Sequence, residues 1–239
     1  MYLKIRGKFV QIIKEYGLQE EEVTVKAKPL TSEEAIGNPE EDDYPLIKGK
    51  ERLMQAEFKN SFGQAFTDMY GNYKGKLTDI MRMELKNNFR RAIFISTLNA
   101  VMGYLKLADK TVHCKNKEPR ECSKKLAGYI REKFGSPDKI AIVGFQPRMV
   151  EALAKNFKVR VTDLDSDNIG KEKFGVYIED ANKTEENLKW CDVALITGTT
   201  VVNNSIKNFL ISKPVIFYGV TIAGAAELLD LNRFCPLAT

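Results

Sequence analysis

The chain has 239 residues, of which 44% are hydrophobic and 29% are charged, and its formal net charge is +5. This composition predicts a folded protein with one large domain or two small ones. The mild charge, with no arginine-rich block, argues against nucleic-acid binding, and no apolar run is long enough to cross a membrane. Because the first residues lack the apolar segment of a secretory signal, we expect a cytoplasmic protein.

The cysteine and histidine content limits the metal chemistry that one chain can offer. The sequence holds Cys114, Cys122, Cys191 and Cys235, and His113 is its only histidine. Thiols stay reduced in the cytosol, so a disulfide framework is not expected. Zinc sites that need two histidines, including the HExxH helix, are excluded.

The first third of the chain predicts a helix followed by short strands. Apolar residues spaced near 3.6 positions predict an amphipathic helix over residues 1–18, and alternation predicts a half-exposed strand over 22–28. Acidic residues and prolines over 31–45 predict a surface loop. Two short apolar segments within 51–68 predict a β-hairpin, in which Gly63 marks a bulge or a close approach of the backbone to a ligand.

A long buried helix is predicted next. Residues 77–83 form a short helical pattern, and residues 89–107 are apolar almost all round, which predicts a buried helix. Asn99, in the middle of this helix, must find hydrogen-bond partners or face a polar cleft. Pro119 suits the first turn of a further helix that continues to Phe134.

After a break near residue 135 the pattern changes to strands alternating with helices. This alternation predicts a parallel sheet with crossover helices, so we divide the chain into an N-terminal α+β domain (1–135) and a parallel-sheet domain (136–239). The predicted strands cover 139–144, 159–165, 176–178, 193–196 and 214–219. The predicted helices cover 146–156, 185–190, 203–210 and 223–229.

Three turns rich in small residues follow strands of this predicted sheet. Gly144, the segment Gly198-Thr199-Thr200, and Gly219 each end an apolar run. The carboxyl ends of parallel strands meet at one edge, where open α/β sheets bind their ligands. The sequence therefore predicts a ligand cleft at this edge. A simpler interpretation makes Thr199 or Thr200 an ordinary helix cap.

Two acids suggest a nucleotide-like cofactor as an alternative. Asp163 and Asp165 come 19 and 21 residues after Gly144, where dinucleotide enzymes place the acid that binds a ribose. The G-x-G-x-x-G fingerprint is absent, however, and aspartates at strand ends also serve as turn formers.

A separate cluster suggests a transition-metal ion. His113, Cys114 and Cys122 are residue types that zinc, iron or a softer metal binds. Their spacing matches no zinc finger. Two other interpretations stand beside this one: the thiols are small buried side chains, or one of them is a reactive thiol activated by a helix start.

Taken together, several segments resemble the prokaryotic family of putative heavy-metal chelation domain proteins, a family of unknown function. The resemblance spans essentially the whole chain, and its most specific segment is Thr197-Gly-Thr-Thr-Val-Val-Asn203. The other segments that carry it are 63–68, 97–100, 113–122, 144–147, 163–165 and 217–224.

The resemblance implies an architecture and a place for the site. It implies an enolase N-terminal-like α+β domain packed on a Rossmann-like domain, with the site in the cleft between them. Where the family pattern has a glycine after Asn203, this chain has Asn204. Asparagine tolerates the left-handed conformation that such a turn needs.

We therefore predict a protein that binds a small molecule or a metal complex in the cleft, with a role in heavy-metal chelation. An enzyme with a nucleotide-like cofactor and a protein-interaction module are the two alternatives. The sequence assigns no reaction, and a homo-oligomer is compatible with it. The predicted ligand-binding residues are Asn99, Gly144, Asp163, Asp165, Gly198, Thr199, Thr200, Asn203 and Gly219.

Overall fold

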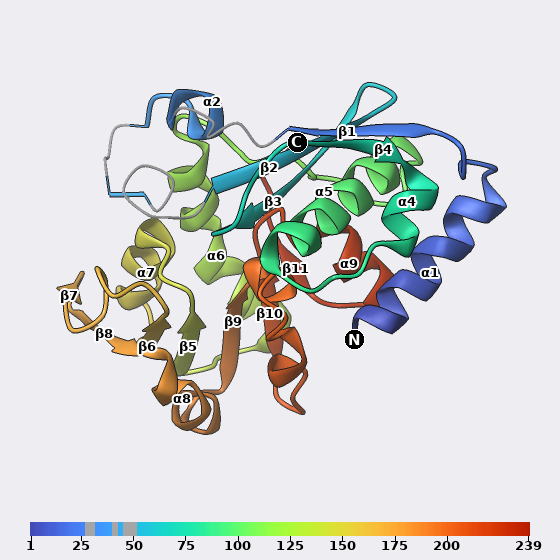
Figure 1. Cartoon of the computed structure of the whole chain (residues 1–239). Helices are drawn as coiled ribbons and strands as arrows, with labels where there is room; N and C mark the ends of the chain where they lie inside the picture. Colours follow the sequence, from blue (N-terminus) through green and yellow to red (C-terminus); the bar gives the residue numbers. More distant parts are fainter. Residues whose placement is uncertain (27–31, 40–42, 45–51) are drawn as a thin grey trace.

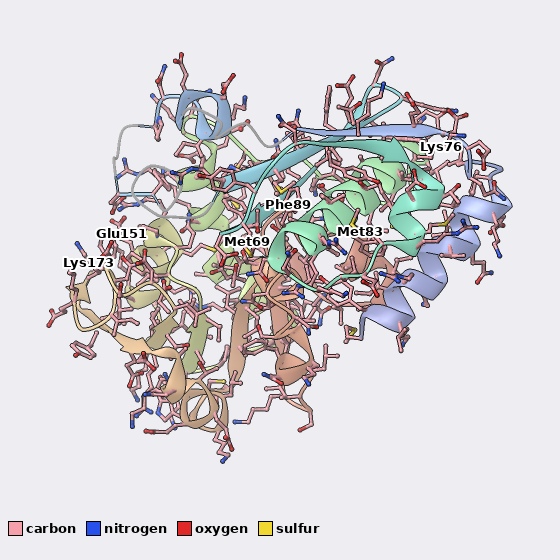
Figure 2. The ribbon with its side chains drawn as sticks, viewed as in Figure 1. Met69, Lys76, Met83, Phe89, Glu151 and Lys173 are labelled. Atoms are coloured by element: carbon pink, nitrogen blue, oxygen red, sulfur yellow. The ribbon has the colours of Figure 1, made fainter. Side chains whose placement is uncertain are left out.

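The computed structural model describes residues 1–26, 32–39, 43–44 and 52–239. It combines a four-stranded antiparallel sheet with a seven-stranded, mostly parallel sheet, and Figure 1 shows the first at the top and the second below it. The predicted α/β class is confirmed. No helix among the described ranges is long and apolar enough to cross a membrane. Charged side chains such as Lys76 and Lys173 lie at the periphery (Figure 2).

The antiparallel sheet has the strand order β3-β2-β1-β4. The predicted helices and hairpin are present, and β4 is an addition that the sequence pattern did not reveal. The elements of this half are α1 (Tyr2–Glu15), β1 (Glu22–Lys26), α2 (Ser32–Ile36), β2 (Arg52–Phe58), β3 (Ser61–Thr67), β4 (Tyr73–Lys76), α4 (Leu77–Arg82), α5 (Asn88–Tyr104) and α6 (Glu118–Phe134).

The hairpin β2–β3 closes through a tight turn at Lys59 and Asn60. Both residues have positive φ, 46° and 65°, which is the geometry of a two-residue type I′ turn. Within β3, Gly63 lies against the backbone of α5. A Cβ atom at Gly63 would lie 2.6 Å from the carbonyl carbon of Asn99 and closer still to the backbone of Ala100. The close approach predicted at Gly63 is therefore to a helix of the same chain.

Helix α5 lies between the antiparallel sheet and the helix α9 (Ala223–Leu229) (Figure 1). Its residues from Ala92 to Met102 are all buried, as the all-round apolar pattern predicts. One face packs on β2 and β3, and the opposite side packs on α9. The helix therefore joins the two halves of the chain.

Asn99 supplies the polar link across this junction. Its side-chain Nδ2 donates to the carbonyl oxygens of Gln64 (2.9 Å), Val220 (3.1 Å) and Thr221 (3.2 Å). Its Oδ1 accepts the backbone N–H of Gly224 at 2.8 Å. The fully buried amide thus connects β3, α5 and the turn before α9.

The larger sheet has the order β11-β10-β9-β5-β6-β8-β7, parallel except for the β7–β8 pair. Without the antiparallel edge strand β7, this is the order 3-2-1-4-5-6 of doubly wound sheets. Its strands are β5 (Lys139–Val143), β6 (Lys158–Asp163), β7 (Glu172–Lys173), β8 (Val176–Asp180), β9 (Val193–Thr197), β10 (Val215–Tyr218) and β11 (Arg233–Phe234). The connecting helices are α7 (Pro147–Ala154) and α8 (Thr184–Trp190).

The two faces of the parallel sheet contribute to different cores. Leu126 and Ile130 of α6 form one cluster with side chains of α7 and of the strands, such as Ile142. On the other face, Ala194 and Ile196 share a cluster with the core of the antiparallel half. Helix α6 therefore packs with the parallel sheet, although it precedes residue 136.

Two predicted elements differ from the structure. The helix predicted over 203–210 is replaced by the short 3₁₀ turn η3 (Ile206–Phe209), which follows an earlier 3₁₀ turn, η2 (Gly198–Val201). Asn204 lies between them with φ = 64°, and a left-handed residue interrupts an α-helix. Within the loop predicted over 31–45, Ser32–Ile36 forms the helix α2, while residues 31, 40–42 and 45 lie outside the described residues.

Helix α1 packs against α9 (Figure 1). Lys8 Nζ donates to the carbonyl oxygen of Leu228 at 2.6 Å, and the Tyr2 hydroxyl donates to that of Val201. Ile5, Phe9 and Ile13 of α1 are fully buried in the shared core. Helix α1 is thus held in place by residues of the C-terminal half of the chain.

Replacing Gly63 by alanine tests the contact between β3 and α5. The new methyl group would overlap the α5 backbone, so we expect a loss of about 3 kcal/mol in the free energy of unfolding. Gly128→Ala in α6 is the matched control, because its Cβ atom would meet nothing within 4 Å. That variant should gain about 1 kcal/mol through helix propensity. Urea denaturation measures both, and equal effects would contradict the close approach.

Replacing Asn99 by alanine tests the buried amide link. The change leaves three carbonyls and one N–H without the partner that they have now, so we expect a loss of about 3 kcal/mol. The exposed Asn182→Ala control should change stability by less than about 0.5 kcal/mol. A loss at Asn99 as small as that of the control would show that the link contributes little.

Candidate functional site

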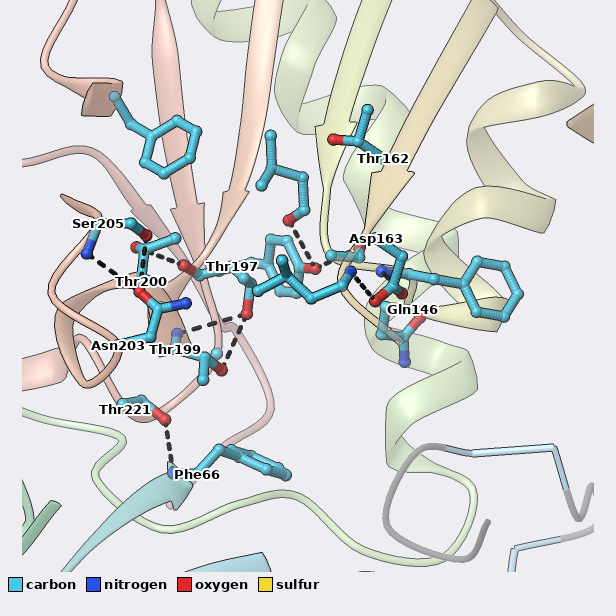
Figure 3. Close-up of a pocket in the computed structure, with 18 of the residues that line it drawn as sticks. Phe66, Gln146, Thr162, Asp163, Thr197, Thr199, Thr200, Asn203, Ser205 and Thr221 are labelled. Atoms are coloured by element: carbon cyan, nitrogen blue, oxygen red, sulfur yellow. Dashed lines mark hydrogen bonds between the residues drawn. The ribbon is translucent and has the colours of Figure 1, made fainter. Parts of the chain in front are cut away.

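A cavity of 1230 Å³ lies where the antiparallel half meets the carboxyl ends of the parallel strands (Figure 3). Phe66, Thr67 and Asp68 line it from the end of β3. The turns after β5 and β9 line it from the other side, including Gly144 and Thr197. This position agrees with the general rule for ligands of open α/β sheets.

The turn after β9 presents a row of hydroxyl groups to the cavity. Thr197 caps the 3₁₀ turn η2, and its Oγ1 accepts the backbone N–H of Thr199 at 3.4 Å and lies 3.1 Å from Thr199 Oγ1. The Thr200 hydroxyl donates to the Thr197 carbonyl at 2.8 Å. The cap residue is therefore Thr197, and the predicted caps Thr199 and Thr200 lie one and two residues past the start of the turn.

Asn203 is held by the residues that follow it. Its Oδ1 accepts the Ser205 hydroxyl at 2.6 Å and the Ser205 backbone N–H at 3.0 Å. Both residues line the cavity, and Figure 3 shows the Asn203 amide beside Thr199 and Thr200. Since Asn203 Nδ2 donates no hydrogen bond within the described chain, this NH₂ group can donate to a ligand.

The turn after β5 is closed by a tyrosine from β10. Tyr218 reaches past β9, and its hydroxyl donates to the carbonyl oxygen of Gly144 at 2.7 Å. Gly144 has φ = 91°, and a Cβ atom there would lie 2.9 Å from the Tyr218 hydroxyl and from Thr197 Cγ2. Glycine is therefore required for its backbone conformation and for the space that these two side chains occupy.

Asp163 uses its carboxylate to fix the turns on both sides of it. One oxygen accepts the backbone N–H of Phe145 at 2.8 Å, and the other accepts those of Leu164 at 2.6 Å and Asp165 at 2.9 Å. Burial raises the pKa of Asp163, while these N–H donors act in the opposite direction. Its role is structural as well as electrostatic, because it holds the first turn of the sheet against the loop after β6.

Asp165 and Asp68 are the more available carboxylates of the cavity. Asp165 accepts the backbone N–H of Asp167 at 3.0 Å, and Asp68 accepts the side-chain amide of Asn88 at 2.6 Å. Among the described lining residues, the only lysines or arginines are Lys189 and Lys213. This part of the wall therefore favours ligands without negative charge.

Three of the four cysteines line the cavity together with His113. Burial raises the pKa of Cys122 to about 12, and it also raises the pKa values of Cys114 and Cys235. Burial lowers the pKa of His113, whose Nδ1 lies 2.6 Å from the Cys114 carbonyl oxygen. These side chains are therefore neutral near pH 7.

The predicted metal set does not form a complete binding cage. In the part of the chain that the structure describes, no three His, Cys, Asp or Glu side chains are grouped so that they could hold a metal ion. Cys122 would need to lose a proton that burial stabilises before binding a metal. The arrangement thus gives His113, Cys114 and Cys122 no support as joint ligands of a bare ion.

The structure brings most of the predicted ligand residues together and separates one. The cavity is lined by Gly144, Asp163, Asp165, Gly198, Thr199, Thr200, Asn203 and Gly219, but Asn99 is not among the lining residues. Both hydrogen-bonding groups of Asn99 are used within the protein. Thr197, Tyr218 and Asp68 also line the cavity but were not among the predicted ligand-binding residues. Thr197 belonged to the turn predicted after the strand 193–196, and Tyr218 to the strand predicted over 214–219. For Asp68 the pattern allowed either a cleft residue or an ordinary polar position on an exposed strand.

The fold and the cavity define an α/β protein with a ligand-sized site at the junction of two sheets. Residues 130–230 match the model of the family described as putative heavy-metal chelation. This match agrees with the family resemblance seen in the sequence.

The solved structures that resemble the chain include the following two. One is a protein of unknown function from the DUF364 family of Pyrococcus horikoshii, with a TM-score of 0.58, 17% identity, and coverage of 91% of this chain and 78% of that chain. The other is a DUF364 protein of unknown function from Desulfitobacterium hafniense DCB-2, with a TM-score of 0.52, 14% identity, and coverage of 74% and 72%. At these identities the structures show a common fold alone. No curated protein matches the chain.

Thiol labelling tests the protonation state of the cavity. A raised pKa lowers the thiolate fraction at a given pH, and the thiolate is the species that reacts. We expect native Cys122 to react with iodoacetamide at about pH 8 at least a hundredfold more slowly than in the unfolded chain. Mass spectrometry of samples labelled with and without guanidinium chloride measures the ratio. Rapid labelling of Cys122 in the folded protein would show an ionised thiol and would support its role as a metal ligand.

Proposed function

We propose that the protein binds a small molecule or a metal complex in the cavity between its two sheets, in a role related to heavy-metal chelation. The observation that carries this proposal is the cavity wall itself, where hydroxyl, amide and carboxylate groups converge from separate turns. A site with several convergent polar groups in a largely apolar cavity is typical of small-molecule binding. The description of the matched family supports the connection with metals.

The charges of the wall narrow the ligand to a neutral or positively charged species. Lys189 Nζ pairs with Glu185 at 2.6 Å. Lys213 Nζ donates to two backbone carbonyl oxygens, those of Lys189 and Cys191. Asp68 and Asp165 form no ion pair among the described residues, so their negative charges are the ones presented to a ligand.

A metal would therefore enter as part of a complex. The described residues offer no three-ligand cage, and their thiols are protonated near pH 7. A complex that already satisfies the coordination of its metal needs only outer contacts from the protein. The hydroxyl of Thr199, the amide of Asn203 and the carboxylate of Asp165 are suited to such contacts.

A nucleotide-like cofactor has support from the strand order, but the local geometry opposes it. In doubly wound folds the pyrophosphate approaches the backbone of the first turn. Here the Phe145 N–H of that turn already donates to Asp163, and the Tyr218 hydroxyl occupies the space beside Gly144. A dinucleotide would also bring negative charge to Asp68 and Asp165.

Two octahedral complexes of opposite charge test the proposal. Hexaamminecobalt(III) should raise the melting temperature, whereas hexacyanoferrate(III) should not. A site-specific ligand at 100 times its Kd stabilises by about 2.7 kcal/mol. The double variant Asp68→Asn/Asp165→Asn should lose most of this gain. Asp167→Asn, which removes a neighbouring carboxylate outside the lining, should retain it.

Differential scanning fluorimetry measures these shifts, with NAD⁺ and ATP as further ligands. A shift with NAD⁺ or ATP and none with the cationic complex would favour the cofactor alternative. An equal gain in the double variant and in wild type would place the binding of the complex elsewhere on the surface.

A further inference from the structure

The cavity continues beyond the ends of the strands, along a face of the parallel sheet. Crossovers of doubly wound sheets usually contain an α-helix that covers the sheet. Between β9 and β10, however, the described chain contains only the 3₁₀ turns η2 and η3. The cavity extends beside η3 to Ser212 and Lys213, and on its other side to Leu188 and Lys189 of α8. We call this extension, between α8 and η3, the side channel.

The walls of the side channel are largely apolar. Val143 of β5, Leu188 of α8, and Phe209 and Ile211 of the η3 segment line it, and all four belong to or pack against the same apolar cluster. The hydroxyl groups of Thr162 and Thr184 lie 3.1 Å apart and bond to each other. Figure 3 shows Thr162 on the side of the cavity away from Phe66 and Thr221.

The far end of the side channel carries the ammonium group of Lys213, which forms no ion pair among the described residues. Lys213 Nζ is held by the carbonyl oxygens of Lys189 at 2.6 Å and Cys191 at 2.7 Å. Lys189 itself pairs with Glu185. A ligand that reaches this end therefore gains from apolar contact, and a second positive charge on it would be repelled by Lys213.

We propose that the site takes an aliphatic amine or a similar organic cation, with its charged head at Asp68 and Asp165 and its alkyl chain in the side channel. Charge complementarity selects the head, because these carboxylates line the same cavity without an ion-pair partner in the described chain. The apolar walls of the side channel favour an alkyl chain on the ligand. The inference rests on the proposed function, since it requires the cavity to bind a ligand, and it adds the chemical class of that ligand.

A homologous series of n-alkylamines, from ethylamine to octylamine, tests the inference in the wild-type protein by isothermal titration calorimetry. Each methylene group buried in the side channel should increase affinity about fourfold. The increase should stop when the chain reaches the end of the channel. The n-alkyl carboxylates of equal length should bind at least about tenfold more weakly, because their charge is opposed by Asp68 and Asp165.

A bulky residue in the side channel supplies the matched variant. Ile211→Trp should stop the increase at a shorter amine, while ethylamine binds as in wild type. Leu210→Trp is the control, since Leu210 is exposed and does not line the cavity. It should leave the whole series unchanged.

The outcomes separate the two proposals. Affinity that does not rise with chain length, with ethylamine or hexaamminecobalt(III) still bound, would overturn the side channel and leave the cationic site standing. An equal response to Ile211→Trp and Leu210→Trp would also overturn it. Binding of neither the amines nor the complex would refute both proposals.

Discussion

The buried amide of Asn99 is the interaction on which the arrangement of the two sheets depends. It bonds to β3 on one side and to the turn of residues 220–224 on the other, at the point where Gly63 allows α5 to touch the strand. An unpaired amide in this position would be costly, so these hydrogen bonds fix the position of the two halves of the chain relative to each other. The end of β3 then faces the carboxyl ends of β5 and β9, and the cavity is the space between them.

The sequence pattern predicted the elements whose apolar spacing is regular, and it predicted the sheet edge where most site residues lie. It showed that Asn99 needed partners, but those partners are 35 to 125 residues away, and only the tertiary structure could choose between a hydrogen-bonded link and a cleft residue. The helix prediction for residues 203–210 was wrong for a local reason: Asn204 adopts a left-handed conformation. Tyr218 was missed because its hydroxyl acts across an intervening strand.

Equivalent strand orders do not imply equivalent ligands, and this sheet shows why. The N–H of Phe145 and the space beside Gly144 are the groups that a pyrophosphate would use. The chain fills them with the Asp163 carboxylate and the Tyr218 hydroxyl. What is left for a ligand is the wall of threonines, Asn203, and the carboxylates of Asp68 and Asp165, which form no ion pair within the described part of the chain. The ligand of such a sheet therefore depends on which backbone groups at its edge are not already hydrogen-bonded within the protein.

The packing of α1 against α9 has a consequence for the order of events during synthesis. The contacts of Lys8 with Leu228 and of Tyr2 with Val201 join positions about 200 residues apart. The apolar face of α1 leaves the ribosome early and must wait for residues near 228 before its core is complete. Contacts of such separation slow folding and prolong the exposure of apolar surface. A fragment that ends at residue 135 would meet the same difficulty permanently, because Ile5, Phe9 and Ile13 would lack part of the cluster that buries them.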